Sequence, residues 1–158
     1  MNLSPNLARL FRRDLSRLMQ QVEAFPDDDM LWRKLPGIAN SAGNLVLHLE
    51  GNLREYVGRQ IGGRSYQRTR ELEFSSRGLT REALKARVAE LREVILHIVG
   101  ALSTEQLEST YPEVVLEIPL STQEFLVHLY GHLNWHLGQV DYLRRALSGH
   151  GALERTSL

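Results

Sequence analysis

Two histidines four residues apart stand near the C-terminal end of the chain, in the stretch FLVHLYGHLNWHLGQVDYLRR. Residues at positions i and i+4 of a helix lie on one face, so His132 and His136 can direct both imidazoles at one ion. Phe125 and Leu129 fall on the same face, which turns the pair towards the interior. The spacing favours a metal site, and the alternative is a core helix whose imidazoles are hydrogen-bonded to other groups.

A metal site needs a third ligand, because two imidazoles alone hold an ion weakly. His48 is the candidate, since it lies at helical spacing in a second apolar stretch, VLHLEGNL. Three interior-facing histidines among only six are hard to explain by packing, because a neutral imidazole needs a partner for each ring nitrogen. We therefore predict that His48, His132 and His136 bind a divalent metal ion.

Further polar residues near these histidines are candidates for the pocket or for holding the imidazoles from behind. His128 continues the row on the last helix but lies about 80° around it from His136, so it is expected either to line the pocket or to support a ligand from behind. Gln139 lies one turn after His136, and its alternative role is a hydrogen bond between helices. The side chains that could support an imidazole are Asn44, Asn52, Gln139 and Asp141.

The charged residues around His48 are not expected to join the site. The helical phase of Glu50 and Glu55 places both on the solvated face. Arg54 lies six residues after His48 and is expected to point away from the ion. Four aromatic residues are candidates for a pocket wall, with the core or a dimer interface as the alternative: Trp32, Tyr56, Trp135 and Tyr142.

The chain lacks the motifs of several other active sites and metal sites. A di-iron carboxylate site needs two Glu-x-x-His motifs, and the chain has none. Residues 132–136 read HLNWH, so the His-Glu-x-x-His motif of zinc proteases is absent. No glycine loop with a following Lys-Ser/Thr is present, and the serines lie in no nucleophile motif.

Composition narrows the possible functions further. The chain has 158 residues, which suits one domain, and its 19 basic and 19 acidic residues give no preference for nucleic acid or membrane. It has no cysteine, so any thiol chemistry must use a thiol from outside the protein. No stretch resembles a signal peptide or a membrane span, which leads us to expect a cytoplasmic protein.

Apolar periodicity predicts four long helices and little strand, which is typical of a four-helix bundle. Their expected ranges are 4–25, 40–61, 80–102 and 121–147, with Ser4, Thr80 and Ser121 as N-caps and Gly149 as C-cap. The connections 61–79 and 103–120 are long enough to be crossovers, and 113–118 is expected to be a short strand or hairpin arm. We expect one domain over 1–150 and a C-terminal tail over 151–158.

Two stretches together resemble the DinB/YfiT-like superfamily. They are NSAGNLVLHLEGNLREYV in the second helix and HLYGHLNWHLGQVDYL in the last, and the likeness covers residues 5–148. The resemblance implies an all-α, four-helix bundle with a three-histidine metal site at His48, His132 and His136. It also implies zinc or nickel as the ion, and a homodimer.

Relatives in that superfamily include metal-dependent transferases that use a low-molecular-weight thiol. The resemblance therefore implies a metal-dependent transferase or hydrolase acting on a small molecule, with such a thiol as possible cosubstrate. One alternative is a non-catalytic metal-binding or stress-response protein with a structural or sensing ion, and another is a metal-free interaction module. An open position at the ion would favour catalysis, whereas a fourth protein ligand such as His128 would favour a structural ion.

Overall fold

The structure is a computed structural model that describes residues 3–154. Within that range the chain forms α-helices and one π-helical segment, with isolated β-bridges but no strand. The elements are α1 (Ser4–Glu23), α2 (Asp28–Trp32), α3 (Ala42–Leu53), η1 (Arg54–Arg59), α4 (Arg70–Ser75), α5 (Arg81–Ala101), α6 (Thr104–Glu108) and α7 (Thr122–Ser148). The predicted all-α fold class is confirmed.

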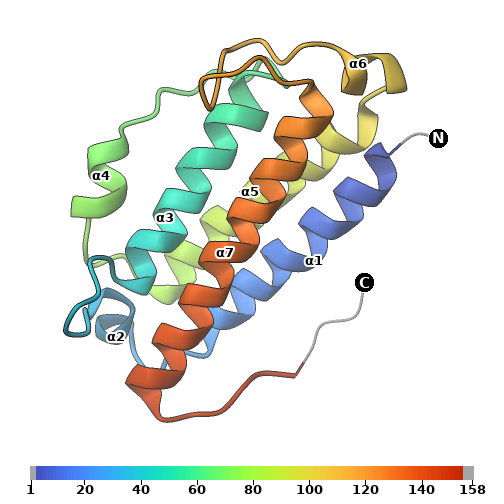
Figure 1. Ribbon diagram of the computed structural model, residues 1–158. Helices are drawn as coiled ribbons and strands as arrows, with labels where there is room; N and C mark the ends of the chain where they lie inside the picture. The colour runs from blue at the N-terminus through green and yellow to red at the C-terminus, as the bar shows by residue number, and fades with distance from the viewer. Residues whose placement is uncertain (1–2, 155–158) are drawn as a thin grey trace.

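The four long helices α1, α3, α5 and α7 form the bundle (Figure 1). Helix α1 packs against α5 and α7, and α3 packs against the same two helices, so α1 and α3 lie on one diagonal. In Figure 1, α1 and α7 run downwards while α3 and α5 run upwards. Since α3 and α5 point the same way, the chain between them must return along the length of the bundle.

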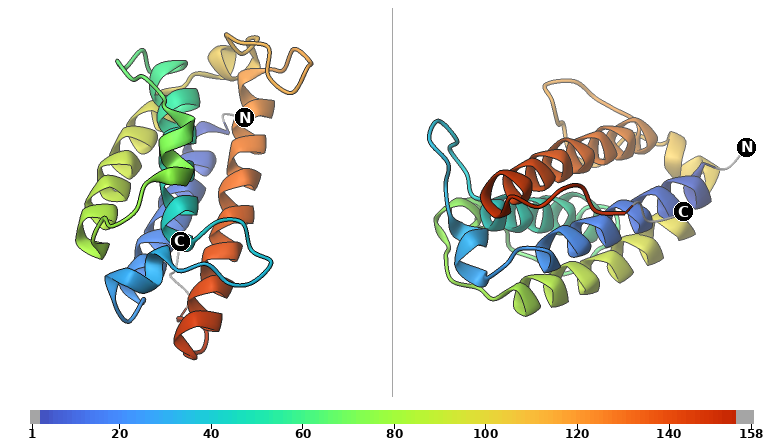
Figure 2. Two further views of the ribbon diagram at one scale, coloured as in Figure 1. Left: turned by 90° about the vertical axis from the view of Figure 1, so that its left-hand side faces the viewer. Right: turned by 90° about the horizontal axis from the view of Figure 1, so that it is seen from below.

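That return is the first long connection, residues 60–80, and it carries α4 outside α3. Figure 2 shows α4 in front of α3 when the bundle is seen from that side. Sequence periodicity predicted no element there, because six helical residues give less than two turns in which an apolar stripe could repeat. The crossover itself was correctly predicted.

The second long connection, residues 102–121, joins the diagonal pair α5 and α7 at one end of the bundle (Figure 1). It contains the short helix α6, which was not predicted. Residues 113–118, predicted as a short strand or hairpin arm, form no strand but contain a tight hairpin turn. Leu116 and Glu117 both have positive φ angles, 56° and 63°, between the bridged residues Val115 and Ile118. Two successive left-handed residues are the signature of a two-residue hairpin turn.

The helix ends agree with most of the predicted caps. The side chains of Ser41, Thr80 and Ser121 each accept a hydrogen bond from a backbone N–H in the first turn of α3, α5 and α7. Gly149 ends α7 with φ of 71°, the left-handed conformation that glycine adopts most easily. The predicted cap at Ser4 was wrong: Ser4 is already helical, and its hydroxyl donates to the backbone oxygen of Val99.

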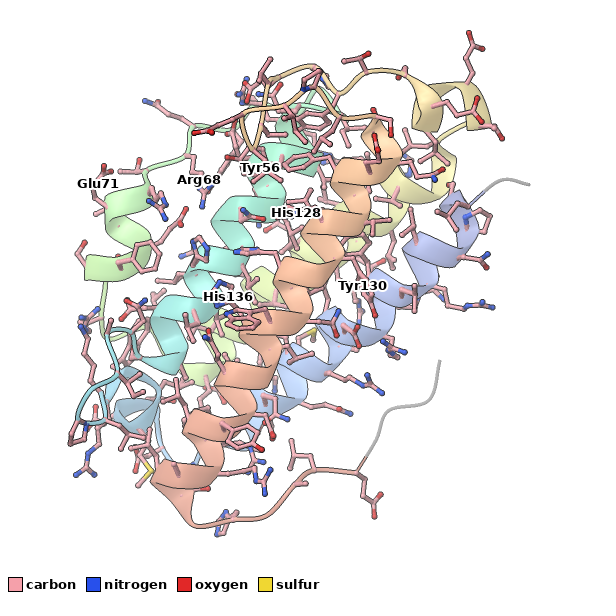
Figure 3. The ribbon with its side chains drawn as sticks, in the orientation of Figure 1. Tyr56, Arg68, Glu71, His128, Tyr130 and His136 are labelled. Carbon is pink, nitrogen blue, oxygen red and sulfur yellow. The ribbon has the colours of Figure 1, made fainter. Side chains whose placement is uncertain are left out.

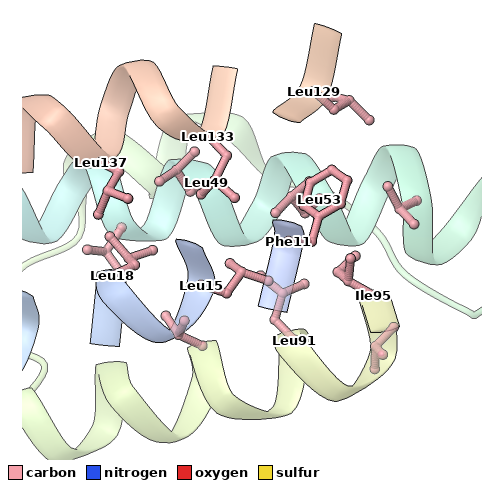
Figure 4. Packing of buried hydrophobic residues seen from close by; sticks show 14 of the residues in the cluster. Phe11, Leu15, Leu18, Leu49, Leu53, Leu91, Ile95, Leu129, Leu133 and Leu137 are labelled. Atoms are coloured by element: carbon pink, nitrogen blue, oxygen red, sulfur yellow. The ribbon is translucent and has the colours of Figure 1, made fainter. Parts of the chain in front are cut away.

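Leucine, isoleucine and phenylalanine side chains from all four long helices fill the core (Figure 4). Phe11 and Leu15 of α1 meet Leu49 and Leu53 of α3 and Leu133 of α7 in one buried cluster. This packing fixes the separation and rotation of α3 and α7, the two helices that carry the candidate ligands.

The predicted solvated face of α3 is not solvated. Every residue from Ala42 to Leu53 is buried, because the returning crossover covers the side that faces away from the bundle. Glu50 is therefore only 3% exposed, and its carboxylate pairs with Arg54 and Arg87. A helix packed on several sides loses the one-sided pattern from which exposure is predicted.

The predicted tail, 151–158, falls within the described residues only as far as residue 154. Arg144 is fully buried and donates from Nη2 to the backbone oxygen of Gly151 at 2.8 Å, so the start of the tail is tied to α7. The division into a domain over 1–150 and a tail stays a prediction. No helix in the described part of the chain is long and apolar enough to span a membrane.

Candidate metal centre

The structure brings His48 of α3 together with His132 and His136 of α7. The Nε2 atom of His132 lies 3.2 Å from Nε2 of His48 and 3.1 Å from Nε2 of His136. One ring nitrogen from each residue falls within 4.8 Å of the other two. The three imidazoles therefore converge on one point between the two helices.

Hydrogen bonds behind the rings decide which nitrogens face that point. His48 donates from Nδ1 to Oε2 of Glu73 at 2.9 Å, and His136 donates from Nδ1 to Oε1 of Gln139 at 2.7 Å. Both acceptors are oxygens, so the proton of each neutral ring sits on Nδ1 and the Nε2 lone pair points inwards. The Nε2 lone pairs of His48 and His136 thus face the same point, where one cation would bind both.

The rings on α7 are held in the neutral form that binds metal. Burial, and after it the neighbouring His136, His48 and His128, lower the pKa of His132 to about 4. Burial also lowers the pKa of His136, against the opposing hydrogen bond with Gln139. Both rings are uncharged at neutral pH, as imidazole ligands must be.

The spacing and the donor set fit a divalent ion. Zinc–nitrogen bonds of about 2.0–2.1 Å in tetrahedral geometry separate the donor atoms by roughly 3.3 Å. Two of the three donor separations, 3.1 and 3.2 Å, are close to that distance, and all three fall within 4.8 Å. Nδ1 of His132 is buried without a hydrogen-bond partner among residues 3–154, so no group supports this ring from behind.

Glu73 of α4 is the part of the site that sequence reasoning missed. Its carboxylate accepts the His48 hydrogen bond and two from Arg68, 2.6 Å from Nε to Oε1 and 2.9 Å from Nη2 to Oε2. Burial opposes ionisation of Glu73, but these hydrogen bonds outweigh it and lower the pKa. A buried carboxylate behind a histidine orients the ring and raises its basicity.

A pocket of about 560 Å³ opens beside the triad, with His48 and His132 in its lining. Figure 3 shows Tyr56, Arg68 and His128 above His136, and all three of these residues line the pocket. His128 is exposed, lines the pocket and stacks on Phe125 with ring centroids 5.8 Å apart. Phe125, Leu129 and the turn at 113–116 complete the wall.

The remaining predicted residues divide between the site and the scaffold. Asn52 is 8% exposed and lines the pocket, and its Oδ1 has no partner among the described residues. Asn44 donates to the backbone oxygens of Glu73 and Ser76, which anchors α4 rather than an imidazole. Asp141 pairs with arginines of α7 instead.

Among the aromatic candidates only Tyr56 lines this pocket. Trp32 packs on Gly43 and donates to the backbone oxygen of Leu79. Trp135 and Tyr142 are 69% and 72% exposed on α7.

The bundle, the crossover and the three converging histidines define a DinB-like protein. A sequence profile of the mycothiol-S-transferase family matches residues 6–149, which is nearly the whole chain. The chain belongs to this family. A comparison with curated proteins gives no match.

Solved structures support the fold at low sequence identity. A conserved protein from Enterococcus faecalis superposes with a TM-score of 0.75 at 15% identity, covering 95% of this chain and 99% of that one. A DinB-like protein from Bacillus subtilis gives 0.71 at 17% identity, covering 94% and 96%. A DinB-like protein from Bacillus cereus gives 0.70 at 13% identity, covering 96% and 95%.

Proposed function

We propose that this protein is a metal-dependent transferase that joins the sulfur of a low-molecular-weight thiol to a small electrophilic substrate. The observation that carries the proposal is the convergence of three imidazoles at the edge of a pocket large enough for a small molecule. Membership of the mycothiol-S-transferase family supports a thiol as the cosubstrate.

His48, His132 and His136 would hold the ion, with zinc and nickel both suited to such a donor set. A bound divalent ion lowers the pKa of a coordinated thiol or water towards 7. Glu73 and Gln139 fix the orientation of two rings from behind, so the donor atoms stay in place as substrates enter and leave.

The proposed transfer needs one further group from the protein, a base for the thiol proton. The S–H bond breaks, a C–S bond forms at the electrophilic carbon, and the leaving group departs with its electron pair. His128 lines the pocket outside the triad and is exposed, so its imidazole can accept the thiol proton and pass it to solvent. The chain has no cysteine, so the sulfur cannot come from the protein.

The alternative is a non-catalytic protein with a structural or sensing ion. Such an ion is normally enclosed by four protein ligands. In the described part of the chain, no fourth histidine or carboxylate joins the triad, and His128 stays outside it. This arrangement favours an ion with an open position over a closed one. A homodimer and a cytoplasmic location remain predictions.

The test begins with the metal content of protein purified without a histidine tag. We expect about one equivalent of divalent ion per chain in wild type and a large loss in His132→Ala. His150→Ala is the matched control, since His150 follows α7 and lies outside the triad. The loaded protein is then assayed with several small thiols and a chromogenic electrophile. Equal metal content in wild type and His132→Ala would sink the proposal.

A further inference from the structure

An arginine with no acidic partner stands in the lining of the pocket beside the triad. Arg70 begins α4, and within residues 3–154 no carboxylate lies within 4.0 Å of its guanidinium. Its Cζ atom instead lies 5.5 Å from the centre of the Phe74 ring, and that ring packs 5.0 Å from the ring of His48. This stacking places the unpaired charge of Arg70 on one side of Phe74, and that ring also contacts the candidate ligand His48.

A second guanidinium in the same lining has donor capacity left. Arg68 uses Nε and Nη2 on Glu73, and its Cζ lies 5.7 Å from the centre of the Tyr56 ring. Its Nη1 forms no hydrogen bond with the described residues. Arg68 is held on two sides, so this group is fixed before any ligand arrives, which lowers the entropy cost of binding.

The acidic groups near the pocket are paired with residues other than Arg70. Glu113 is the one carboxylate among the residues that line it within the described range, and it accepts hydrogen bonds from Arg59 and Gln60. Glu73 is shared by Arg68 and His48. The lining itself therefore holds two arginines and one carboxylate, and Arg70 is the arginine that no acidic group of the described residues neutralises by direct contact.

Much of the remaining lining is apolar. Val114 and Leu116 of the tight turn are 74% and 55% exposed and line the pocket together with Phe125 and Leu129. A guanidinium offers a planar pair of N–H donors that matches a carboxylate. An organic acid with an apolar body would find N–H donors for its carboxylate and apolar side chains for its body.

We propose that this pocket binds a small organic carboxylate with an apolar body, and that Arg70 recognises its carboxylate. The inference rests on the proposed function, since the carboxylate belongs to one of the two transferase substrates, the electrophile or the thiol. Arg68 supplies further positive charge, but its bond to Glu73 ties it to the metal centre. Arg70 is the residue at which recognition can be tested separately.

The first experiment measures binding without turnover. Chelator-treated, metal-free protein is titrated calorimetrically with 3,5-dinitrobenzoate and with the neutral 3,5-dinitrobenzamide. We expect the carboxylate to bind roughly tenfold more tightly, the value for one charge-assisted contact at a partly exposed site. Arg70→Gln should abolish the difference, and Arg70→Lys should retain part of it.

Arg12→Gln is the matched control, because Arg12 is an exposed arginine of α1 outside the pocket. It should leave the preference for the carboxylate unchanged. Equal binding of the two probes by wild type, or an equal loss in Arg12→Gln and Arg70→Gln, would overturn the inference. These outcomes do not depend on whether the protein is a transferase.

The second experiment decides which substrate carries the carboxylate. Metal-loaded protein is assayed with N-acetylcysteine or its amide, each paired with 4-chloro-3,5-dinitrobenzoate or its methyl ester. In each reaction the sulfur replaces chloride, which leaves with its electron pair while the thiol proton is released. The value of kcat/KM should fall about tenfold in Arg70→Gln only with the charged partner that the pocket recognises.

An equal fall with all four pairs would contradict recognition of a carboxylate by Arg70. If no pair reacts, the transferase function fails for these substrates, while the binding experiment still decides the inference. Metal content measured in Arg70→Gln should equal that of wild type. A lower content would mean that Arg70 acts through the metal centre and not on the substrate.

Discussion

Nδ1 of His48 donates to Oε2 of Glu73 at 2.9 Å, and this bond joins a bundle helix to the crossover outside it. Glu73 is only 6% exposed, and Arg68 holds its other side. The first long connection is therefore part of the predicted metal centre. Displacing α4 should change the orientation of His48 while the bundle stays folded.

Glu73→Gln should weaken metal binding about 10- to 100-fold, the usual effect of removing a carboxylate behind a ligating histidine. The amide keeps the shape of the side chain but loses the charge that supports the His48 ring. Chelator-competition titration with zinc and nickel measures the change. Glu71→Gln, an exposed neighbour on the same helix, serves as the control and should bind like wild type. Equal metal affinities of the two variants would show that Glu73 does not support metal binding.

Gly51→Ala should reduce metal affinity and stability together. A Cβ at Gly51 would come within 2.1 Å of Oε1 and 2.8 Å of Cδ of Glu73, so α4 or the carboxylate must move. We expect a loss of about 1–3 kcal/mol in the free energy of unfolding, as for other overpacked sites. Urea denaturation of the metal-free protein measures it.

The control for this substitution is Gly100→Ala in α5. The nearest atom to a Cβ there is Cβ of Ala8 at 3.8 Å, an ordinary contact. Alanine should stabilise this helix by roughly 0.5–1 kcal/mol. A Gly51→Ala protein that is as stable as wild type and binds metal as tightly would show that Glu73 adjusts without cost.

The bundle and the grouping of the histidines could be predicted because both are written in helical periodicity. His132 and His136 are one turn apart, and the apolar residues around His48 place that ring on an interior face. The capping signals of Thr80 and Ser121 predicted two helix starts, since a side-chain cap depends on neighbouring residues alone.

The parts that could not be predicted depend on contacts between distant segments. Glu73 lies in a six-residue helix without an apolar repeat, and its bond to His48 spans 25 residues. The helical phase of Glu50 predicts a solvated residue, but the crossover covers that side of α3 and buries it. No local pattern tells where a returning segment will lie.

Gln139→Ala should weaken metal binding less than Glu73→Gln. The bond from Nδ1 of His136 to Oε1 of Gln139 is short, 2.7 Å, but the acceptor is neutral and its side chain is exposed. Water can replace a lost neutral acceptor at an exposed position, so a loss below about tenfold is expected. The same chelator competition measures it. A loss of affinity larger than that of Glu73→Gln would show that Gln139 contributes more to metal binding than Glu73.

The buried carboxylate of Asp14 should make stability depend on acid pH. Asp14 is fully buried in α1, and its carboxylate accepts hydrogen bonds from Arg13 and Arg17, and from the Tyr130 hydroxyl at 2.6 Å. Burial alone would raise its pKa, but the hydrogen bonds outweigh burial and lower it below the ordinary value. A depressed pKa contributes stability above the unfolded value, about 3.9, and loses it as the pH falls below that towards the folded pKa.

Asp14→Asn should therefore lower the free energy of unfolding by roughly 1–3 kcal/mol at pH 7, because it leaves the Arg13 donors without their charged partner. The difference from wild type should shrink as the pH falls from about 5 to 3. Urea denaturation of metal-free protein across this range measures both. Asp29→Asn, on an exposed residue of α2, should differ little from wild type at any of these pH values. A difference for Asp14→Asn that stays constant down to pH 3 would mean that its contribution comes from packing and not from its charge.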